Sequence, residues 1–225
     1  MSGTTLARVG AGLLVLAGGF AVMVLEIAGA RYLARDFGAS FYVWISQIGV
    51  VLVALAIGYA AGGALADKFN RAWPLSIPLA IAGGITWFIP VFTPPVIRAI
   101  VMRHPLDQPI PLVWQKLDPV LGSTLVFFLP CLALAILSPY VIRLAAQSVE
   151  KVGTVSGLVY ASSTAGSIAG VFVSGYVLLD LFPVSTIFRA TGLLLCLLSA
   201  MSLGLDRWMG RGSGATANGA DKADR

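Results

Sequence analysis

The chain contains six long apolar runs, each close to the length that an α-helix needs to cross a lipid bilayer. A helical span takes roughly 20 apolar residues. In hydrocarbon every backbone N–H and C=O needs a partner within the chain, which only helices and closed barrels provide. The sequence therefore predicts an all-α integral membrane protein with about six transmembrane helices, at residues 9–32, 41–66, 75–92, 120–141, 155–179 and 186–205.

The composition excludes the soluble alternatives. Of the 225 residues, 58% are hydrophobic and 11% are charged, whereas a soluble domain carries about 25% charged residues. A chain this poor in polar side chains cannot cover the surface of a water-soluble globule. A soluble enzyme, a disordered protein and a secreted disulfide scaffold are all excluded.

The net charge of +5 does not indicate a nucleic-acid partner. The 15 Lys and Arg residues are dispersed singly, as in basic loops at a membrane surface. Membrane lipid is therefore the expected partner of these side chains. Cys131 and Cys196 both lie in apolar runs, where cysteine more often fills a core than forms a disulfide or a metal site.

The domain organisation follows from the apolar runs. We expect a cytoplasmic N-terminus at 1–8, a membrane domain at 9–205 and a disordered cytoplasmic tail at 206–225. Residues 93–119 contain six prolines and are expected to form a long periplasmic loop.

With six spans, both termini share one side of the membrane. That side carries nine basic residues, against five or six on the other side, so it should be cytoplasmic. The nine are Arg8, Lys68, Arg71, Arg143, Lys151, Arg207, Arg211, Lys222 and Arg225; the others are Arg31, Arg35, Arg98, Arg103 and Lys116, with Arg189 at the border.

The loop after the second run carries a recognisable charge pattern. Gly63 is followed by Asp67, Lys68 and Arg71, which resembles the cytoplasmic loop signature of the major facilitator superfamily. In that family these residues connect helix ends and help to set the conformational equilibrium. Asn70 stands where the pattern usually has Gly. The alternative interpretation is an ordinary charged loop that closes a helical hairpin.

Polar residues inside the first two runs are candidates for an intramembrane site. Glu26 has no charged residue within four positions, and an intramembrane carboxylate is costly enough to suggest a function. It either forms a structural ion pair with Arg31 or binds a substrate or a proton. Trp44 and Gln47 lie three residues apart in the second run, where an interface aromatic and an interhelical hydrogen bond are the favoured roles.

The fifth run is rich in small residues at a spacing of four. Such spacing lets helix backbones approach closely, and hydroxyl groups can hydrogen-bond between helices. We expect this helix at the centre of the bundle, either only packing or also lining a substrate path. The residues concerned are Gly153, Gly157, Tyr160, Thr164, Gly166 and Gly170.

Recognisable catalytic patterns are lacking. The only histidine is His104, so one chain cannot form a His-based triad or a multi-histidine metal site. Gly10 and Gly12 lie in a membrane run without a preceding strand, so they are not a nucleotide fingerprint. The sequence predicts no enzyme activity, no cofactor and no metal.

Two stretches resemble one family. These are Glu26 to Arg31, continuing through Phe37-Gly38 and Trp44 to residues 58–67, and then residues 153–170. They resemble the membrane domain of bacterial spermidine synthase-like membrane proteins, also called fused major facilitator/spermidine synthase proteins. Ser163 stands where that pattern has Asn. The resemblance implies a location in the bacterial inner membrane and a bundle similar to half of a major facilitator transporter.

The resemblance also shapes the expected function. Family members commonly carry a soluble aminopropyltransferase-like domain after the spans, whereas this chain continues only as a short tail, so any such activity would need a separate chain. Half of a transporter normally needs a second half. We therefore expect a homo-oligomer or another membrane subunit. The leading interpretation is a non-catalytic subunit that anchors or assembles a partner, including a soluble synthase-like one; the alternative is a transporter for a small, cationic metabolite.

Overall fold

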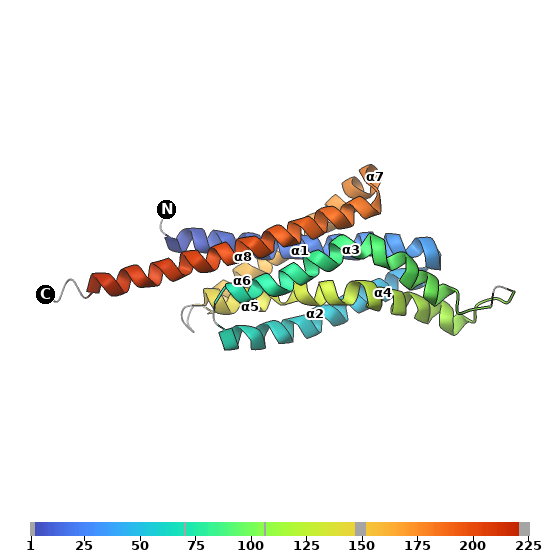
Figure 1. Cartoon of the computed structure of the whole chain (residues 1–225), viewed down its shortest axis with the longest axis horizontal. Coiled ribbons are helices and arrows are strands. Elements are labelled where there is room, and N and C mark those ends of the chain that lie inside the picture. Colours follow the sequence, from blue (N-terminus) through green and yellow to red (C-terminus); the bar gives the residue numbers. More distant parts are fainter. Residues whose placement is uncertain (1–2, 70, 106, 147–151, 221–225) are drawn as a thin grey trace.

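A computed structural model describes residues 3–69, 71–105, 107–146 and 152–220, and this part of the chain is helical without a β-strand. Figure 1 shows an elongated bundle in which α1 begins and α8 ends at the same end. We call it the terminal end, and the opposite one the far end. The elements are α1 (Gly3–Phe37), α2 (Phe41–Phe69), η1 (Trp73–Leu75), α3 (Ser76–Val101), α4 (Leu112–Ala135), α5 (Leu137–Ala145), α6 (Val152–Val173), η3 (Ser174–Leu178), α7 (Leu179–Leu181) and α8 (Val184–Ala220).

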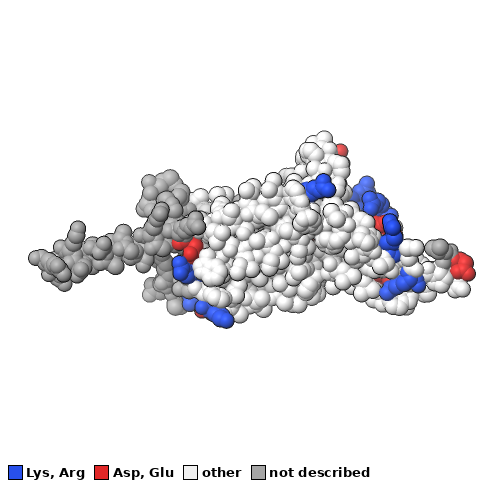
Figure 2. Space-filling model, viewed as in Figure 1, with Lys and Arg blue, Asp and Glu red and all other residues white. Residues whose placement is uncertain are grey.

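The predicted all-α class and the six spans are confirmed. Six helical stretches are long and apolar enough to cross a bilayer. Figure 2 shows charged side chains at the two ends of the described bundle and a broad uncharged band between them. This is the distribution that a helical bundle needs when lipid surrounds its middle. The six stretches are Val9–Phe37, Phe41–Phe69, Trp73–Val101, Leu112–Ala145, Val152–Leu181 and Val184–Gly204.

The proline-rich segment is more helical than expected, which corrects the long loop predicted at 93–119. Helix α3 continues through Pro94 and Pro95 to Val101, and α4 begins at Leu112. Each proline removes one backbone donor, and membrane helices tolerate this where neighbouring helices and side chains compensate. Only residues 102–111 connect the two helices, and residue 106 lies outside the described part.

Two spans are interrupted within the membrane region. The fourth breaks at Ile136 between α4 and α5, three residues before Pro139, which has no N–H for the carbonyl of Ala135. The fifth changes to a π-helical segment at Ser174–Leu178 before it ends in α7. Irregular backbone at this depth is tolerated where it lies within the protein or lines a cavity.

Helix α1 occupies the centre of the bundle. It contacts α2, α3, α4, α5, α6 and α8, and Leu14, Leu25 and Leu33 along its length are fully buried. At the far end Gly38, with φ of 85°, makes the turn into α2, a conformation that glycine adopts without a steric penalty. A chain reversal of three residues therefore places α2 antiparallel to the central helix.

The fifth span lies at the edge of the bundle, so the prediction that it is central is wrong for the single chain. Within the apolar part of this span 17% is buried, whereas the corresponding part of the first span is 50% buried. It packs mainly on α1, with a smaller contact to α5. Small residues identify a helix that can approach another closely, but their periodicity does not say how many neighbours it has.

The last helix extends beyond the membrane span. The sequence predicts disorder from residue 206, whereas α8 is helical to Ala220. Adding residues to an existing helix avoids the cost of nucleation. Residues 221–225 of the predicted tail lie outside the described part of the chain.

Candidate functional site

Glu26 lies near the middle of α1 and is partly buried. The structure does not contain the structural ion pair with Arg31 that the sequence suggested, and no other described residue forms one with Glu26. Five residues correspond to about 140° around an α-helix, and Arg31 is exposed near the far end. The two side chains therefore leave α1 on different faces, and Glu26 remains an unpaired carboxylate within a span.

Gln47 makes the interhelical hydrogen bonds that a buried amide needs. Its Nε2 donates to the carbonyl of Leu25 on α1 at 3.4 Å, and the Ser123 hydroxyl on α4 donates to its Oε1 at 2.6 Å. The side chain of Gln47 is fully buried, whereas Trp44 is 38% exposed. The two residues are not brought together, and Gln47 connects three helices at the core.

The loop motif forms a charge network at the terminal end. Arg143 at the end of α5 donates from Nε to Asp67 Oδ1 at 2.9 Å, and Arg71 lies 3.2 Å from Asp206 on α8. The backbone N–H of Ala72 also donates to Asp206, at 3.0 Å. The second span is thereby connected to the fourth and the loop to the sixth.

The remaining motif residues take little part in this network. The Lys68 ammonium lies 5.5 Å from the centroid of the Phe69 ring. A Cβ at Gly63 would meet no atom within 4 Å, whereas one at the preceding Gly62 would collide with the Ile136 carbonyl. Close approach between α2 and the fourth span therefore occurs at Gly58 and Gly62 and not at Gly63.

The small residues of α6 divide into two sets. A Cβ at Gly166 or Gly170 would collide with the backbone carbonyl of Leu16 or Phe20, so these glycines let α6 approach α1. Gly153 and Gly157 face open space. Tyr160 is 55% exposed, and Thr164 is also exposed.

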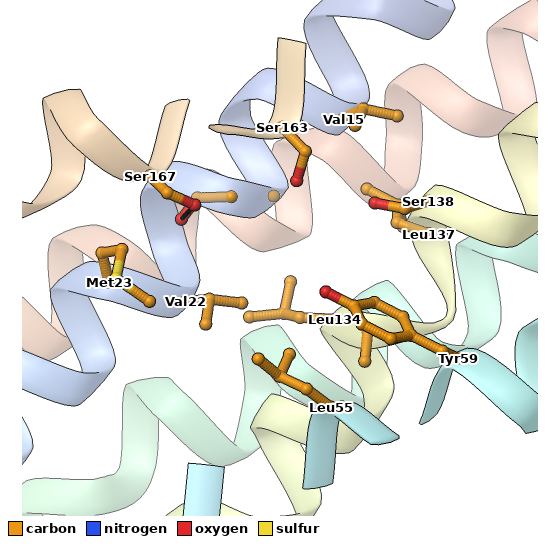
Figure 3. A pocket seen from close by; sticks show the side chains of 13 residues that line it. Val15, Val22, Met23, Leu55, Tyr59, Leu134, Leu137, Ser138, Ser163 and Ser167 are labelled. Carbon is orange, nitrogen blue, oxygen red and sulfur yellow. Dashed lines mark hydrogen bonds between the residues drawn. The ribbon is translucent and has the colours of Figure 1, made fainter. Parts of the chain in front are cut away.

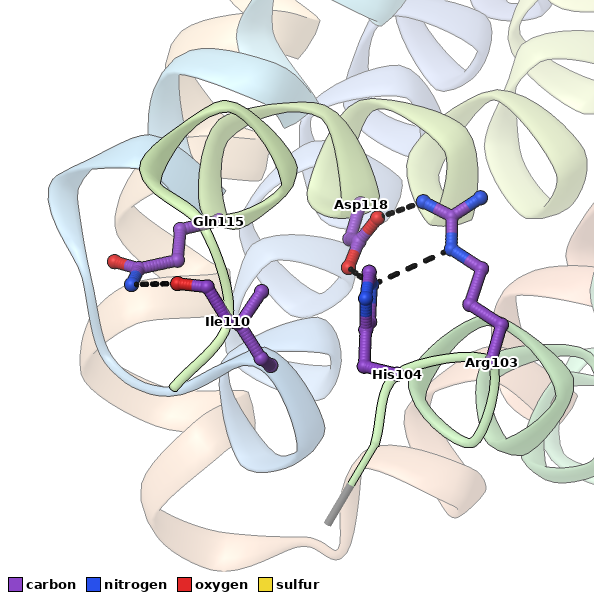
Figure 4. A network of polar contacts seen from close by, with 5 residues as sticks. All are labelled: Arg103, His104, Ile110, Gln115 and Asp118. Carbon is purple, nitrogen blue, oxygen red and sulfur yellow. Dashed lines mark hydrogen bonds and ion pairs between the residues drawn. The ribbon is translucent and has the colours of Figure 1, made fainter. Parts of the chain in front are cut away.

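A third polar cluster, which the sequence analysis did not single out, closes the far end (Figure 4). Asp118 at the start of α4 pairs with Arg103, and its Oδ2 lies 2.8 Å from His104 Nε2. The Arg103 guanidinium also lies 4.1 Å from the centroid of the Trp114 ring. The one histidine of the chain, 14 residues from an aspartate flanked by proline, was the available signal. The cluster connects the end of α3 to the start of α4.

A cavity of about 370 Å³ adjoins this cluster at the far end. Its polar lining includes Asp36, Ser40, Tyr42, Gln115 and Asp118. Both carboxylates already have an arginine neighbour, because Arg103 pairs with Asp118 and Arg35 lies 3.8 Å from Asp36. The arrangement supports closure of the helix ends more directly than it supports capture of a charged ligand.

The described residues form neither a metal site nor a disulfide. No group of three or more His, Cys, Asp or Glu side chains lies close enough together there to hold a metal ion. Cys131 is buried and Cys196 is exposed, and both are free thiols.

Fold and charge distribution together define a class, a six-span α-helical membrane protein with charge networks at both ends. No protein-family model, curated protein or solved structure matches the chain. Function is therefore inferred from the side chains and contacts of this chain.

Proposed function

We propose that the chain is a non-catalytic membrane subunit that assembles with a second membrane-embedded unit, either another copy of itself or a different subunit. The observation that carries the proposal is the bare stripe of α6, formed by Gly153, Gly157, Tyr160 and Thr164. Their spacing of four, three and four residues places them on one helix face. Among the described residues, no atom outside the adjoining backbone of α6 lies within 4 Å of a Cβ built at either glycine.

The stripe differs from the other outward faces of the bundle. Lipid-facing positions elsewhere carry large apolar side chains, such as Leu52 on α2 and Leu125 on α4, which are 59% and 63% exposed. A face of glycine, tyrosine and threonine offers lipid fewer contacts, but it allows another helix to approach closely and to hydrogen-bond. The stripe lies about a third of a turn from the face that packs on α1, so a second unit could cover it without displacing α1.

Paired glycine substitutions test assembly separately from folding. Gly157→Leu should leave the single chain folded and shift it from a larger complex to a monomer in native lipid discs. Gly166→Leu should instead disrupt the packing of α6 on α1, because its side chain would collide with the Leu16 backbone. The measurement is particle mass by light scattering, with mass spectrometry of co-purifying proteins.

The result also identifies the partner. Cross-linking through Gly157→Cys, in a chain with Cys131 and Cys196 replaced by Ala, should trap one defined species. Leu158→Cys, which is 65% exposed on the same helix, is the matched control. A chain that remains monomeric in native lipid and yields no Gly157→Cys product would contradict the proposal. The resemblance suggests a soluble spermidine synthase-like enzyme as an additional partner, which would bind outside the membrane and not at the stripe.

The resemblance and the basic-residue count also support a location in the bacterial inner membrane with both termini in the cytoplasm. The part of the count that rests on Lys151, Lys222 and Arg225 lies outside the described residues. The test is a reporter fused after residue 225. Activity characteristic of the cytoplasm supports this orientation, and activity characteristic of the periplasm reverses it.

A second candidate function is transport of a small, cationic metabolite by an oligomer of half-transporters. Glu26 favours it, because an intramembrane carboxylate without an ion pair is a plausible substrate or proton site. In reconstituted vesicles, Glu26→Gln should abolish the flux of the transported cation, and Glu26→Asp should retain part of it. An unchanged flux in Glu26→Gln would exclude this role for the residue.

A further inference from the structure

A small cavity lies between the first, second, fourth and fifth spans (Figure 3). Its volume is about 50 Å³, and it is open on one side. The α1 side is formed by Val15, Gly18, Gly19, Val22 and Met23. No charged side chain of the described residues lines it. The cavity lies within one chain, so its existence does not depend on the proposed assembly.

Hydroxyl groups from three helices point into this cavity. Figure 3 shows the oxygens of Tyr59, Ser138 and Ser163 directed at the space between them. None of the three has a hydrogen-bond partner among the residues that the structure describes, although Ser167 donates to the carbonyl of Gly19 at 3.3 Å. Ser138 is only 7% exposed, so bulk solvent does not satisfy its hydroxyl.

Hydroxyl groups of the bundle differ in whether they are hydrogen-bonded, and those of Thr86, Thr93 and Ser174 are buried without a partner among the described residues. Ser46, Thr124 and Thr191 donate to the carbonyl four residues earlier at 2.6 to 2.8 Å, as hydroxyls in membrane helices commonly do. The hydroxyls of Ser138 and Ser163 make no such bond. An unsatisfied polar group within hydrocarbon costs several kcal/mol. Ser138 and Ser163 both border the cavity, where a bound guest would supply the missing partners.

The break in the fourth span lies beside the same cavity. Ala135 lines it, and the residue four positions later is Pro139, which has no N–H to donate. The carbonyl of Ala135 therefore lacks its helical partner. A hydroxyl group can donate or accept, so the three hydroxyls of the cavity can satisfy both the donors and the acceptors of a water molecule.

The space is sufficient for such a guest. A cavity needs about 10 to 15 Å³ of probe volume and two to four polar partners to hold one water. We propose that this cavity is a hydrated binding site for water or the hydroxyl group of a small uncharged solute, connected to the aqueous phase at the terminal end. Ser138 lies seven residues from the end of α5, or about 10 Å, which makes that connection short.

The site lies next to Glu26 along α1. Val15, Gly19 and Val22 line the cavity, and Glu26 follows at the same spacing of four, three and four residues, on the same helix face. The next helical turn thus continues the cavity wall with a carboxylate. A hydrated pocket at this position would place water beside the carboxylate.

Reaction of introduced thiols with Ag⁺ tests this proposal, because the reaction requires a hydrated thiolate and the ion is small enough for the cavity. In a chain with Cys131 and Cys196 replaced by Ala, we expect Ser138→Cys and Ser163→Cys to react at least tenfold faster than Ser174→Cys. Ser174 is fully buried and lies outside the cavity. Free thiols are then counted after denaturation.

Leu158→Cys reports the reactivity of a lipid-facing position on the same helix, and it should be as slow as Ser174→Cys. Reaction of the two cavity thiols at the control rate would show a dry cavity and overturn the proposal. Equally fast reaction at Leu158→Cys would also overturn it, because access would then not be specific to the cavity. Neither result depends on whether the chain forms an oligomer.

Discussion

The two ends of the bundle use charged residues in different ways. At the terminal end, the Asp67–Arg143 pair joins residues far apart in the sequence, and both side chains are at least half exposed. At the far end, the Asp118 side chain is 6% exposed and pairs with Arg103 and His104, which lie in the short connection that leads into its own helix. Buried pairs are costly to break, whereas exposed pairs contribute little to stability. The far-end cluster should therefore stabilise the connection between α3 and α4. The Asp67–Arg143 pair at the terminal end should instead affect how α2 is placed relative to α5.

The largest effect should come from Asp118. Asp118→Ala removes the partner of both Arg103 and His104, and it should lower the free energy of unfolding by about 2 kcal/mol, since Arg103 keeps some contact with water. The melting temperature in a fixed detergent measures the change. Asp107→Ala, an exposed carboxylate in the same connection, should leave it unchanged. Equal effects of both variants would remove the distinction between the two ends.

An intermediate effect is expected at Asp206. Asp206→Ala loses both the ion pair with Arg71 and the hydrogen bond from the Ala72 N–H, at about 1 kcal/mol in total. Asp206→Asn retains an oxygen acceptor for that N–H, so it should recover most of the loss. Melting temperatures of the two variants in one detergent separate the contributions. If Asn is as damaging as Ala, the charge rather than the backbone hydrogen bond anchors α8.

The smallest effect on stability is expected at Asp67. Asp67→Asn should change the free energy of unfolding by less than about 0.5 kcal/mol, because the pair with Arg143 is solvent-exposed. If the loop acts as the major facilitator signature does, the same variant should alter the distance between α2 and α5, measured with paired spin labels. A distance distribution that stays unchanged would favour an ordinary charged loop.

The charge-swapped double variant sharpens this test. Asp67→Arg combined with Arg143→Asp should restore the distance distribution of the original chain, whereas each single variant should not. Failure of the double variant to restore it would mean that the distance does not depend on this pair.

The polar residues show which interactions the sequence could predict and which it could not. Gln47 was expected to bond between helices, and a lone buried amide has few alternatives in a span. The interpretation of Glu26 and Arg31 as a pair failed because sequence proximity does not overcome the rotation of about 140° between them. Asp118 was missed because its partners lie across a connection that the sequence did not predict to be short. For α6, the glycine spacing identified close packing but not which of the two sets would meet α1.

The sequence by itself determined the six helical spans and the concentration of charge at their ends. Lipid accepts neither unpaired backbone groups nor uncompensated charge, so length and apolar character suffice to predict both. Only the tertiary structure decided which helix is central, which glycines touch another backbone, and which hydroxyls share a cavity. These outcomes depend on the rotation and order of the helices, and they are set by side-chain packing between residues far apart in the chain.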